Sequence, residues 1–377
     1  MSPASRMEIL QPQALTAEDE ALWADFLAAR PDLAGPYFDL RYIRAIARDV
    51  PRAGIVRLYD GDRVAGYFPY QIRSGVVQPL GAPLTDYHGV IAAPGFTPDF
   101  KALIRETGAR RLEFQGWIGV MDPGATTVGL KRRLADATQG YDHWFATQDE
   151  LHHKFFKNIG RCQRNIEKDF GGFAFSWERV TSELLDWTLD LKRDQYKKTG
   201  MHDVFACGWT RTLLENLAAL EGEDYGLRAG VLRHDGKIVA SEISLMNRDE
   251  VHLWFPAYDP AYYRYSVGIV LTVAIIRELS AKGIRRFDFG TGGEEYKSPL
   301  TSEGGDCHEG ELAPAPHLVS AMLDRMTRPA VRLSLKRRIK LIRATETSFG
   351  GWGRALVRLM QRAASRLRAR LAPPRPV

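Results

Sequence analysis

The sequence predicts an α/β (α+β) protein of two similar domains, each with a mixed twisted sheet flanked by helices. Three observations support this prediction. The chain has 377 residues, which is more than one ordinary domain holds and comfortable for two. Hydrophobic residues make up 45% and charged residues 26%, the balance of a globular protein. A strand–turn–strand pattern near the start of the chain also returns in its second half.

The repeated pattern has the signature of a β-hairpin. Residues 52–67 (RAGIVRLYDGDRVAGY) place two β-rich runs around a turn at Asp60-Gly61. Residues 228–245 (RAGVLRHDGKIVASEISL) repeat it around Asp235-Gly236, with one residue of slip in the first strand. Self-similarity at a fixed offset indicates repeated units. We therefore expect an internal duplication, although a chance match of two hairpins is the alternative.

The predicted domains cover residues 1–145 and 146–315, and a basic tail covers 316–377. Residues 17–30 predict a helix, because acidic side chains occupy its first turn and Arg30 its last position. Residues 38–48 predict a second helix before the first hairpin.

The elements after the second hairpin are also predictable. Residues 251–258 predict a strand, and residues 266–282 a helix that Ser266 caps and Gly283 ends. A further strand is expected at 284–289. The two strands should be parallel and joined by a right-handed crossover.

Charge is unevenly distributed along the chain. The net charge is +6, but residues 317–377 contain fifteen Lys or Arg and two acidic residues. The rest of the chain is therefore mildly acidic, and DNA binding is not expected of it. Three distant cysteines without C-x-x-C spacing predict neither a disulfide framework nor a metal site. No signal-peptide pattern or long apolar run is present, so a cytoplasmic protein is expected.

The first candidate site is the turn that precedes the helix at 266–282. The first turn of a helix offers free backbone N–H groups and a positive dipole end, which bind phosphate. Gly268 allows close approach of a ligand, and Arg264 suits a bidentate phosphate contact. A well-capped helix start without a ligand is the alternative interpretation. The predicted cofactor-binding residues are Arg264, Tyr265, Ser266, Val267, Gly268 and Ile269.

The runs WFPAYDPAYYRYSVGIVL (254–271) and GIRRFDFGTGGEEYKSPL (283–300) resemble acetyltransferase-like proteins of cellulose biosynthesis. These CelD/BcsL proteins belong to the GNAT superfamily and are related to the FemAB peptidoglycan transferases. In that family an aromatic residue, a Ser and a Gly open the helix that cradles the cofactor pyrophosphate, and Tyr265, Ser266 and Gly268 match them. The broader GNAT fingerprint, Gln/Arg-x-x-Gly-x-Gly/Ala, agrees only at Gly268.

The resemblance extends from about residue 38 to 311 and excludes the tail. It implies tandem GNAT-like (FemAB-like) domains, acetyl-CoA as acyl donor, and a sugar or glycan as acceptor. An N-acetyltransferase of exopolysaccharide, cellulose or holdfast adhesin biosynthesis is therefore expected. Two alternatives stay open. One is a FemAB-like transferase that uses aminoacyl-tRNA, and the other is a non-catalytic GNAT-like module that regulates polysaccharide synthesis.

The second candidate site is the strand end and glycine-rich loop that begin at Asp288. Polar side chains at the carboxyl end of a strand lie where α/β sheets bind ligands. Acyl transfer to an amine needs a base for the nucleophile and benefits from an acid for the thiolate. Asp288 or Glu295 is predicted as base and Tyr296 as acid, with Lys297 as a substrate contact. Glu242, in a strand, is a further candidate base. The alternative for Asp288 is a cap of the following loop, for Glu295 solvent exposure, and for Glu242 exposure or a salt bridge.

Further substrate contacts are predicted in the first half and in a basic helix. Asp86, Tyr87 and His88 form a polar cluster that in the family faces the cleft between the domains, and histidine titrates near neutral pH. A turn stabilised by Asp86 is the alternative. Lys157 and Arg161 share a helix face with other cations, which suits a phosphate-bearing substrate or simply a solvated face. Arg193 and Tyr258 complete the predicted set.

The tail has the pattern of a basic amphipathic helix. Arginines recur every four residues from Arg354 to Arg370, beside an apolar stripe that includes Leu356 and Met360. This pattern suits an anionic membrane surface, and clustered arginines also suit cyclic di-GMP. We predict peripheral association with the inner face of the cytoplasmic membrane, with a solvated tail as the alternative. The predicted contacts of the tail ligand are Arg354, Arg358 and Arg362.

Overall fold

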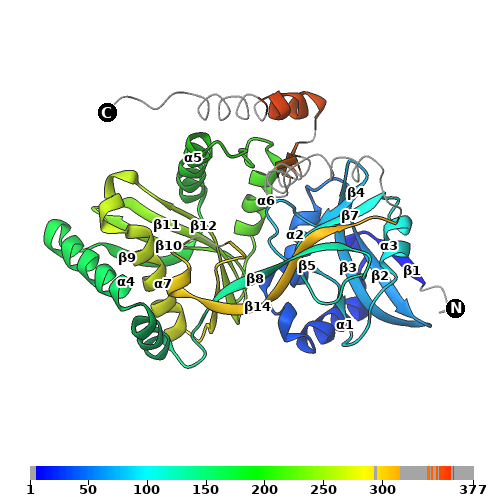
Figure 1. Ribbon diagram of the computed structural model, residues 1–377, viewed down its shortest axis with the longest axis horizontal. Coiled ribbons are helices and arrows are strands. Elements are labelled where there is room, and N and C mark those ends of the chain that lie inside the picture. Colours follow the sequence, from blue (N-terminus) through cyan, green and yellow to red (C-terminus); the bar gives the residue numbers. More distant parts are fainter. Residues whose placement is uncertain are drawn as a thin grey trace, which may run out of the picture.

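The computed structural model describes residues 6–292, 295–314, 338–339, 341–342, 345–346, 348–357 and 360. One large twisted sheet of mixed strand directions runs through the molecule, with helices packed on it (Figure 1). The first half of the chain builds one end of this sheet and the second half the other (Figure 1). The predicted α/β class, with a mixed twisted sheet flanked by helices, is confirmed.

The first half contains β1 (Met7–Leu10), η1 (Pro12–Ala14), α1 (Ala17–Ala28), η2 (Pro31–Leu33), η3 (Pro36–Phe38), α2 (Leu40–Ala47), β2 (Ala53–Asp60), β3 (Arg63–Arg73), β4 (Val76–Pro79), β5 (His88–Gly89), β6 (Ile91–Ala92), α3 (Phe100–Glu106), β7 (Arg111–Ile118) and β8 (Thr126–Asp136). The long helix α4 (Tyr141–Phe170) leads into the second half. The second half contains β9 (Ala174–Arg179), α5 (Ser182–Thr199), α6 (Trp209–Ala218), β10 (Gly226–His234), β11 (Lys237–Met246), β12 (Glu250–Tyr258), η4 (Pro260–Tyr265), α7 (Val267–Ala281), β13 (Arg286–Asp288), η5 (Ser298–Leu300) and β14 (Ser302–Leu312).

The elements predicted around the hairpins are present. The helices expected at 17–30, 38–48 and 266–282 correspond to α1, α2 and α7, and the strands expected at 251–258 and 284–289 to β12 and β13. β12 and β13 are parallel, as predicted.

The two halves exchange strands at the centre of the sheet. The strand order is β1-β2-β3-β4-β7-β14-β8-β13-β12-β11-β10-β9, with β5 beside β7 and β6 beside β3. β14, near the end of the second half, pairs with β7 and β8 of the first. β8 in turn pairs with β13. The sheet is therefore continuous across the junction, and the predicted limits at 145 and 315 stay a prediction.

The two hairpins share an irregularity as well as a sequence pattern. β2–β3 shifts register between Leu58 and Tyr59, and β10–β11 shifts between Leu232 and Arg233. Each shift lies the same distance before the turn, because β2 ends two residues after Leu58 and β10 two residues after Leu232. The shared irregularity supports the predicted duplication of the hairpin.

The turns themselves differ by one position. Asp235 and Gly236 form the second turn, as predicted, and both have positive φ angles. In the first hairpin, however, Asp60 is the last residue of β2, and the turn consists of residues 61–62. The turn therefore begins at Gly61, one residue after the predicted start at Asp60. The reason is the extra residue noted in the sequence of the first strand, which extends β2 through Asp60.

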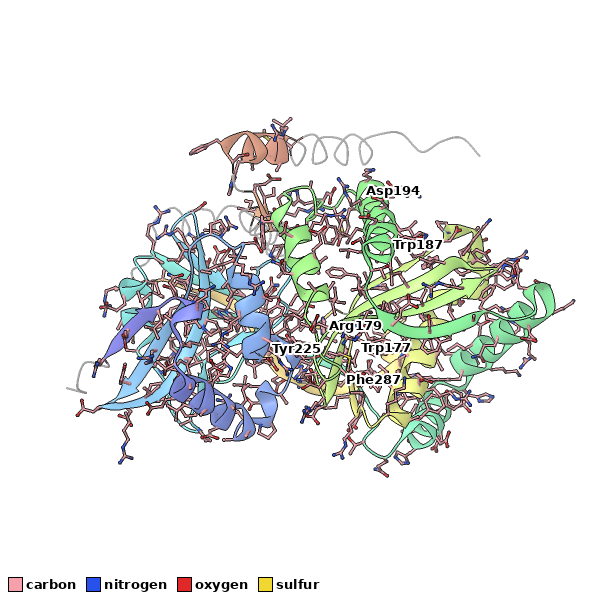
Figure 2. All side chains as sticks on the ribbon, turned by 180° about the vertical axis from the view of Figure 1, so that it is seen from behind. Trp177, Arg179, Trp187, Asp194, Tyr225 and Phe287 are labelled. Carbon is pink, nitrogen blue, oxygen red and sulfur yellow. The ribbon has the colours of Figure 1, made fainter. Side chains whose placement is uncertain are left out.

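A shared hydrophobic core joins the halves. One buried cluster combines side chains of α1 and α2 with side chains of α5, α6 and the strands β10 and β11. Within it, the Tyr225 hydroxyl donates a hydrogen bond to the Pro36 carbonyl at 3.0 Å (Figure 2). α4 and α7 cover the other face of the second-half sheet, over a core that includes Phe287 (Figure 2). Among the described helices, none has the length and apolar content needed to cross a membrane.

Candidate functional site

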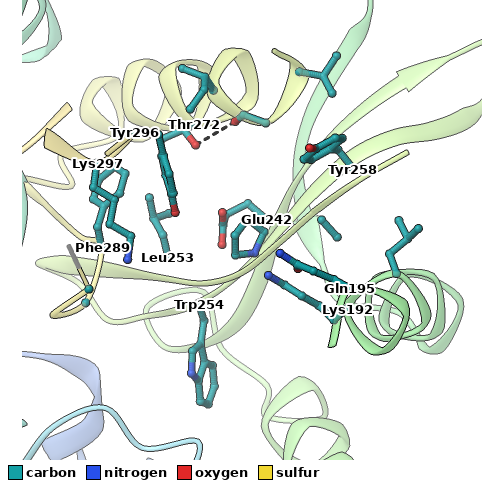
Figure 3. Close-up of a pocket in the computed structure, with 18 of the residues that line it drawn as sticks. Lys192, Gln195, Glu242, Leu253, Trp254, Tyr258, Thr272, Phe289, Tyr296 and Lys297 are labelled. Atoms are coloured by element: carbon teal, nitrogen blue, oxygen red, sulfur yellow. Dashed lines mark hydrogen bonds between the residues drawn. The ribbon is translucent and has the colours of Figure 1, made fainter. Parts of the chain in front are cut away.

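An open cleft of about 1110 Å³ lies in the second half (Figure 3). Its floor is formed by β11 and β12, one wall by η4 and the start of α7, and the other wall by one face of α5. The loop after β13 and Asp86 of the first half complete the lining. Clefts at the carboxyl ends of strands are the usual ligand sites of open α/β sheets.

The first turn of α7 lies at the edge of this cleft. Ser266 has a left-handed conformation, with φ 49° and ψ 39°. It occupies the predicted N-cap position of α7, but its side chain accepts no hydrogen bond from a helix amide. The amides of Ile269 and Val270 both donate to the Ser266 carbonyl, at 2.9 and 3.1 Å. The first turn therefore leaves the amides of Val267 and Gly268 without an intrahelical acceptor. All four of the residues at 266–269 line the cleft.

Gly268 keeps the surface of this turn open. A Cβ atom at this position would contact only the Tyr258 ring, at an ordinary 3.7 Å. Packing within the chain does not require glycine here, whereas close approach of a ligand would. Tyr258 lines the cleft beside it and is 46% exposed.

Arg264 and Tyr265 do not line the cleft. The Tyr265 side chain is buried and donates a hydrogen bond to Asp169 at 2.7 Å. The Arg264 guanidinium lies over the Tyr265 ring, 4.7 Å from its centroid, and 3.8 Å from Asp169. In this structure Arg264 therefore contacts Tyr265 and Asp169, and the phosphate contact stays a prediction.

Glu242 of β11 points into the centre of the cleft (Figure 3). Its side chain is buried, and its Oε1 atom has no hydrogen-bond partner. Burial raises the pKa of this carboxyl to about 8, against the opposing effect of nearby Lys192, His252 and Lys297. A carboxyl group with this pKa suits proton abstraction near neutral pH.

Tyr296 and Lys297 lie across the cleft from Lys192 and Gln195, with Glu242 between the two pairs (Figure 3). The Lys297 ammonium is 5.9 Å from the centroid of the Tyr296 ring. A phenol and two ammonium groups thus surround the buried carboxyl.

Glu295, the other loop carboxylate predicted as base, is exposed and does not line the cleft. Asp288 does not reach the cleft either. It is completely buried and accepts hydrogen bonds from the Tyr87 hydroxyl at 2.8 Å and from Arg132 Nε at 3.0 Å. Burial alone would raise the pKa of Asp288, but His252 and Arg132 hold it well below its usual range. The structure therefore places Asp288 in a buried, ion-paired position outside the cleft, where it also accepts a hydrogen bond from the Gly290 amide at 2.6 Å.

Asp288 belongs to a buried polar cluster that connects the halves. His252 Nε2 lies 2.9 Å from Asp86 Oδ2, and His252 Nδ1 lies 3.5 Å from Asp288 Oδ1. Burial would lower the pKa of His252, but the two carboxylates outweigh it and raise the pKa to about 9. Arg132 of β8 joins Asp288 to Glu250, at 2.8 Å from the latter. Asp86, from the first half, is thereby held at the edge of the cleft.

Tyr87 and His88, which were predicted to contact substrate together with Asp86, lie away from the cleft. Tyr87 is buried within the polar cluster. The His88 ring is buried against Phe68 and Trp117, with centroid distances of 4.9 and 5.1 Å. Burial lowers the pKa of His88 to about 3, so its imidazole stays neutral. Both residues are therefore buried outside the cleft, unlike Asp86, which lines it.

The predicted contacts on α4 and α5 are also elsewhere. Lys157 and Arg161 are exposed on α4, outside the cleft. Arg193 pairs with Asp203 at 2.9 Å and does not line the cleft. The cleft-lining residues of α5 are Leu191, Lys192, Asp194, Gln195, Lys198 and Thr199. The spacing of 192, 195 and 199 places them on one helix face, so helical periodicity would have selected them instead.

The tail residues are only partly described. Arg354 lies exposed in a helical stretch, whereas Arg358 and Arg362 lie outside the described residues.

Most of the second half is similar to a known protein family. Residues 153–298 match the family model of the acetyltransferase (GNAT) domain. The matched range contains the α7 turn, Glu242 and Tyr296, so most of the cleft lies within the part of the chain that is similar to this domain. No curated protein sequence matches the chain.

Solved structures with similar folds include three proteins at low identity. The C-terminal domain of a putative lysylphosphatidylglycerol synthetase from Agrobacterium fabrum is 16% identical, over 82% of this chain and 95% of that domain, with a TM-score of 0.49. A tandem GNAT protein of the clavulanic acid pathway is 10% identical, over 83% and 100%, also at 0.49. FemX is 10% identical, over 84% and 99%, again at 0.49.

Proposed function

We propose that the protein transfers an acyl group, acetyl in the simplest case, from acyl-CoA to an amine in the second-half cleft. One observation carries this proposal: an open helix start and a buried carboxyl with a raised pKa line the same cleft. The first is suited to a pyrophosphate and the second to deprotonation of an amine. The sequence resemblance implies a sugar or glycan as acceptor, so the proposal extends to a reaction of exopolysaccharide or adhesin biosynthesis.

The donor would bind at the start of α7. Its pyrophosphate would accept hydrogen bonds from the amides of Val267 and Gly268, at the positive end of the helix dipole. The surface over Gly268 permits this approach, since a Cβ atom there would meet only the Tyr258 ring, at 3.7 Å.

The acyl transfer itself would use Glu242 and Tyr296. The ionised Glu242 carboxylate takes a proton from the acceptor ammonium, and the free amine attacks the thioester carbonyl. The tetrahedral intermediate then loses the C–S bond, and the Tyr296 hydroxyl supplies a proton to the departing sulfur. A carboxylate with pKa about 8 is basic enough to hold the amine proton while the new C–N bond forms. Amide and free CoA are the products: the second proton of the attacking nitrogen passes to the Tyr296 phenolate as the amide forms, and Glu242 releases its proton to the medium.

Asp86 would contact the acceptor from the opposite half. Its Oδ2 is tied to His252 at 2.9 Å, and its side chain lines the cleft. A fixed carboxylate at this edge suits the hydroxyl or ammonium groups of an aminosugar.

The donor site can be tested without knowing the acceptor. Calorimetric titration with acetyl-CoA should show binding in the micromolar range, and Gly268→Trp should weaken it by at least about tenfold because the indole fills the turn. Release of CoA thiol with glucosamine as probe acceptor then reports transfer. Absence of binding by any acyl-CoA at millimolar concentration would refute the proposal.

A second candidate is a transferase that uses aminoacyl-tRNA, as the FemAB resemblance implies. The exposed basic side chains of α4, including Lys157 and Arg161, favour it because cations there would attract an RNA backbone. If acyl-CoA is the donor, as we propose, replacing Lys157 and Arg161 by Glu should leave acetyl-CoA binding unchanged. A non-catalytic module is excluded if Glu242→Gln removes the transfer activity.

A further inference from the structure

A short helical stretch in the C-terminal region turns an apolar face toward solvent. Residues 349–357 are helical, and so is Met360. Phe349 is 100% exposed and Met360 71%, with Val357 at 53% and Leu356 at 38%. Their spacings of seven, one and three residues place these side chains on a single helix face.

The opposite face of the same stretch is buried. Gly351 is buried, and Ala355 is only 5% exposed. Amphipathic helices of globular proteins ordinarily turn their large apolar side chains inward. Here the small side chains face inward and the large ones outward, which is the arrangement of a surface that binds something else.

The residues immediately before this stretch are fastened to the folded body. Thr345 is completely buried; its carbonyl accepts a hydrogen bond from Trp209 Nε1 at 3.1 Å, and its hydroxyl lies 2.9 Å from His202 Nε2. Trp209 is the first residue of α6. The apolar face therefore starts from a fixed point on the protein, beside α5 and α6 (Figure 1).

Charge identifies the partner. Arg354 is exposed on the same stretch, and the sequence from 317 to 377 contains fifteen Lys or Arg against two acidic residues. Large apolar side chains next to arginines on one helix are the features that hold a helix in the interface of an anionic bilayer. A protein partner would need a groove or an acidic surface of matching shape, which nothing in the described residues specifies.

We propose that the face formed by Phe349, Leu356, Val357 and Met360 inserts into the surface of an anionic lipid bilayer. Arg354 and the other arginines of the tail sequence bind the lipid headgroups, and the folded body of the protein stays on the aqueous side. This places the protein at the membrane surface whatever its acceptor proves to be, so the inference is independent of the proposed reaction.

Co-flotation of the full chain with lipid vesicles tests this directly. At about 0.1 M salt, most of the protein should float with vesicles of phosphatidylglycerol and phosphatidylcholine, and little with phosphatidylcholine alone. The double variant Phe349→Glu/Met360→Glu should reduce the bound fraction about tenfold, because two charges oppose insertion. Raising the salt to about 1 M should weaken binding of the wild type by screening the arginines.

A matched control uses equally exposed apolar residues elsewhere. Leu151 is 67% and Val120 68% exposed, and their double Glu variant makes the same change in charge. It should float like the wild type, and circular dichroism should show both variants folded. The milder Phe349→Ala/Met360→Ala change should give an intermediate loss. Failure of the wild type to float with anionic vesicles, or equal loss in the control, would overturn the proposal.

Discussion

The two halves of the molecule follow the same order of elements up to their hairpins, yet they differ in what surrounds those hairpins. Each begins with a strand, continues through two helices, and reaches a hairpin with the same register shift. The second half then opens a cleft of about 1110 Å³. The first half has, beside Pro69 and His88, a cavity of only about 10 Å³.

One position explains much of this difference. Phe68 in β3 lies ten residues after Leu58, where the first register shift begins. Glu242 in β11 lies ten residues after Leu232, where the second begins, so the two positions are equivalent. Phe68 is completely buried, with His88 at 4.9 Å and Trp117 at 6.0 Å between ring centroids. Where the second half presents a carboxyl to a cleft, the first half packs an aromatic core.

The helices α3 and α7, which follow the two hairpins, also differ in how their first turns are capped. The Asp99 side chain caps α3 by accepting a hydrogen bond from the Ala102 amide at 2.9 Å. The Ser266 side chain makes no such bond at α7. A carboxylate therefore occupies the start of one helix, and open amides form the start of the other. A repeated fold thus carries one closed and one open site, and chemistry follows the side chains rather than the fold.

The largest expected effect comes from replacing the carboxyl that distinguishes the open half. Glu242→Gln keeps the shape of the side chain but removes the base, so kcat/KM for acyl transfer should fall about 10²–10⁴-fold. Acetyl-CoA affinity, measured by calorimetry, should stay within about twofold, because the donor contacts are elsewhere. Unchanged turnover would show that Glu242 is not the base.

The pH profile sharpens the same test. A base with pKa about 8 is active only when ionised, so kcat/KM should rise with pH and level off above about 8. Because the folded-state pKa lies above the ordinary 4.5, ionising Glu242 costs stability as pH rises between these values. Glu242→Gln should therefore be more stable than wild type at pH 8, and the gain should vanish near pH 4.5. A gain that does not depend on pH would contradict the raised pKa.

Phe68 provides the converse experiment in the closed half. Phe68→Ala should lower the free energy of unfolding by about 3–5 kcal/mol, because it leaves a cavity among buried aromatic rings. Turnover per folded molecule should hardly change, since the proposed reaction takes place in the open half. Denaturant unfolding and kinetics on the same sample would separate the two effects. A large loss of turnover in the folded variant would show that the closed half takes part.

The fold was predictable because its signals are local. The Asp235-Gly236 turn, the strand alternation and the helix stop at Gly283 are each determined by a few neighbouring residues. The cleft is not local in this sense, since it combines α5, β11 and α7 with Asp86 from the other half.

The positions of Asp288 and Glu242 in the fold show why the roles of side chains were harder to predict than the fold. Asp288 looks like a base at a strand end, but Arg132, which is 156 residues away in sequence, neutralises it. Glu242 looks like an ordinary strand residue, and only its surroundings in the folded sheet bury it and raise its pKa. A charged residue inside an apolar and small-residue strand was the one available signal, and it pointed to Glu242.

His252 tests whether the closed half is coupled to the open one. Because its pKa is raised to about 9 by Asp86 and Asp288, its contribution to stability is complete below the unfolded value near 6.5 and disappears above 9. His252→Gln should therefore cost up to about 3 kcal/mol at pH 6 and much less at pH 10. Thermal unfolding across this range measures the difference. A cost that is the same at both pH values would indicate lost packing rather than lost charge.

The smallest effect is expected from giving α7 the cap that α3 already has. Ser266→Asp introduces a carboxylate at a left-handed position that aspartate tolerates, and it can accept a hydrogen bond from a first-turn amide. The carboxylate would compete with the donor pyrophosphate for the same amides, so acetyl-CoA affinity should fall about tenfold while stability stays equal or rises slightly. The matched change, Asp99→Ala, should lower stability by about 1 kcal/mol and leave acetyl-CoA affinity unaltered, because α3 is not part of the cleft. If Ser266→Asp left the affinity for acetyl-CoA unchanged, the donor would have to bind away from the start of α7. The difference in capping between α3 and α7 would then have no bearing on donor binding.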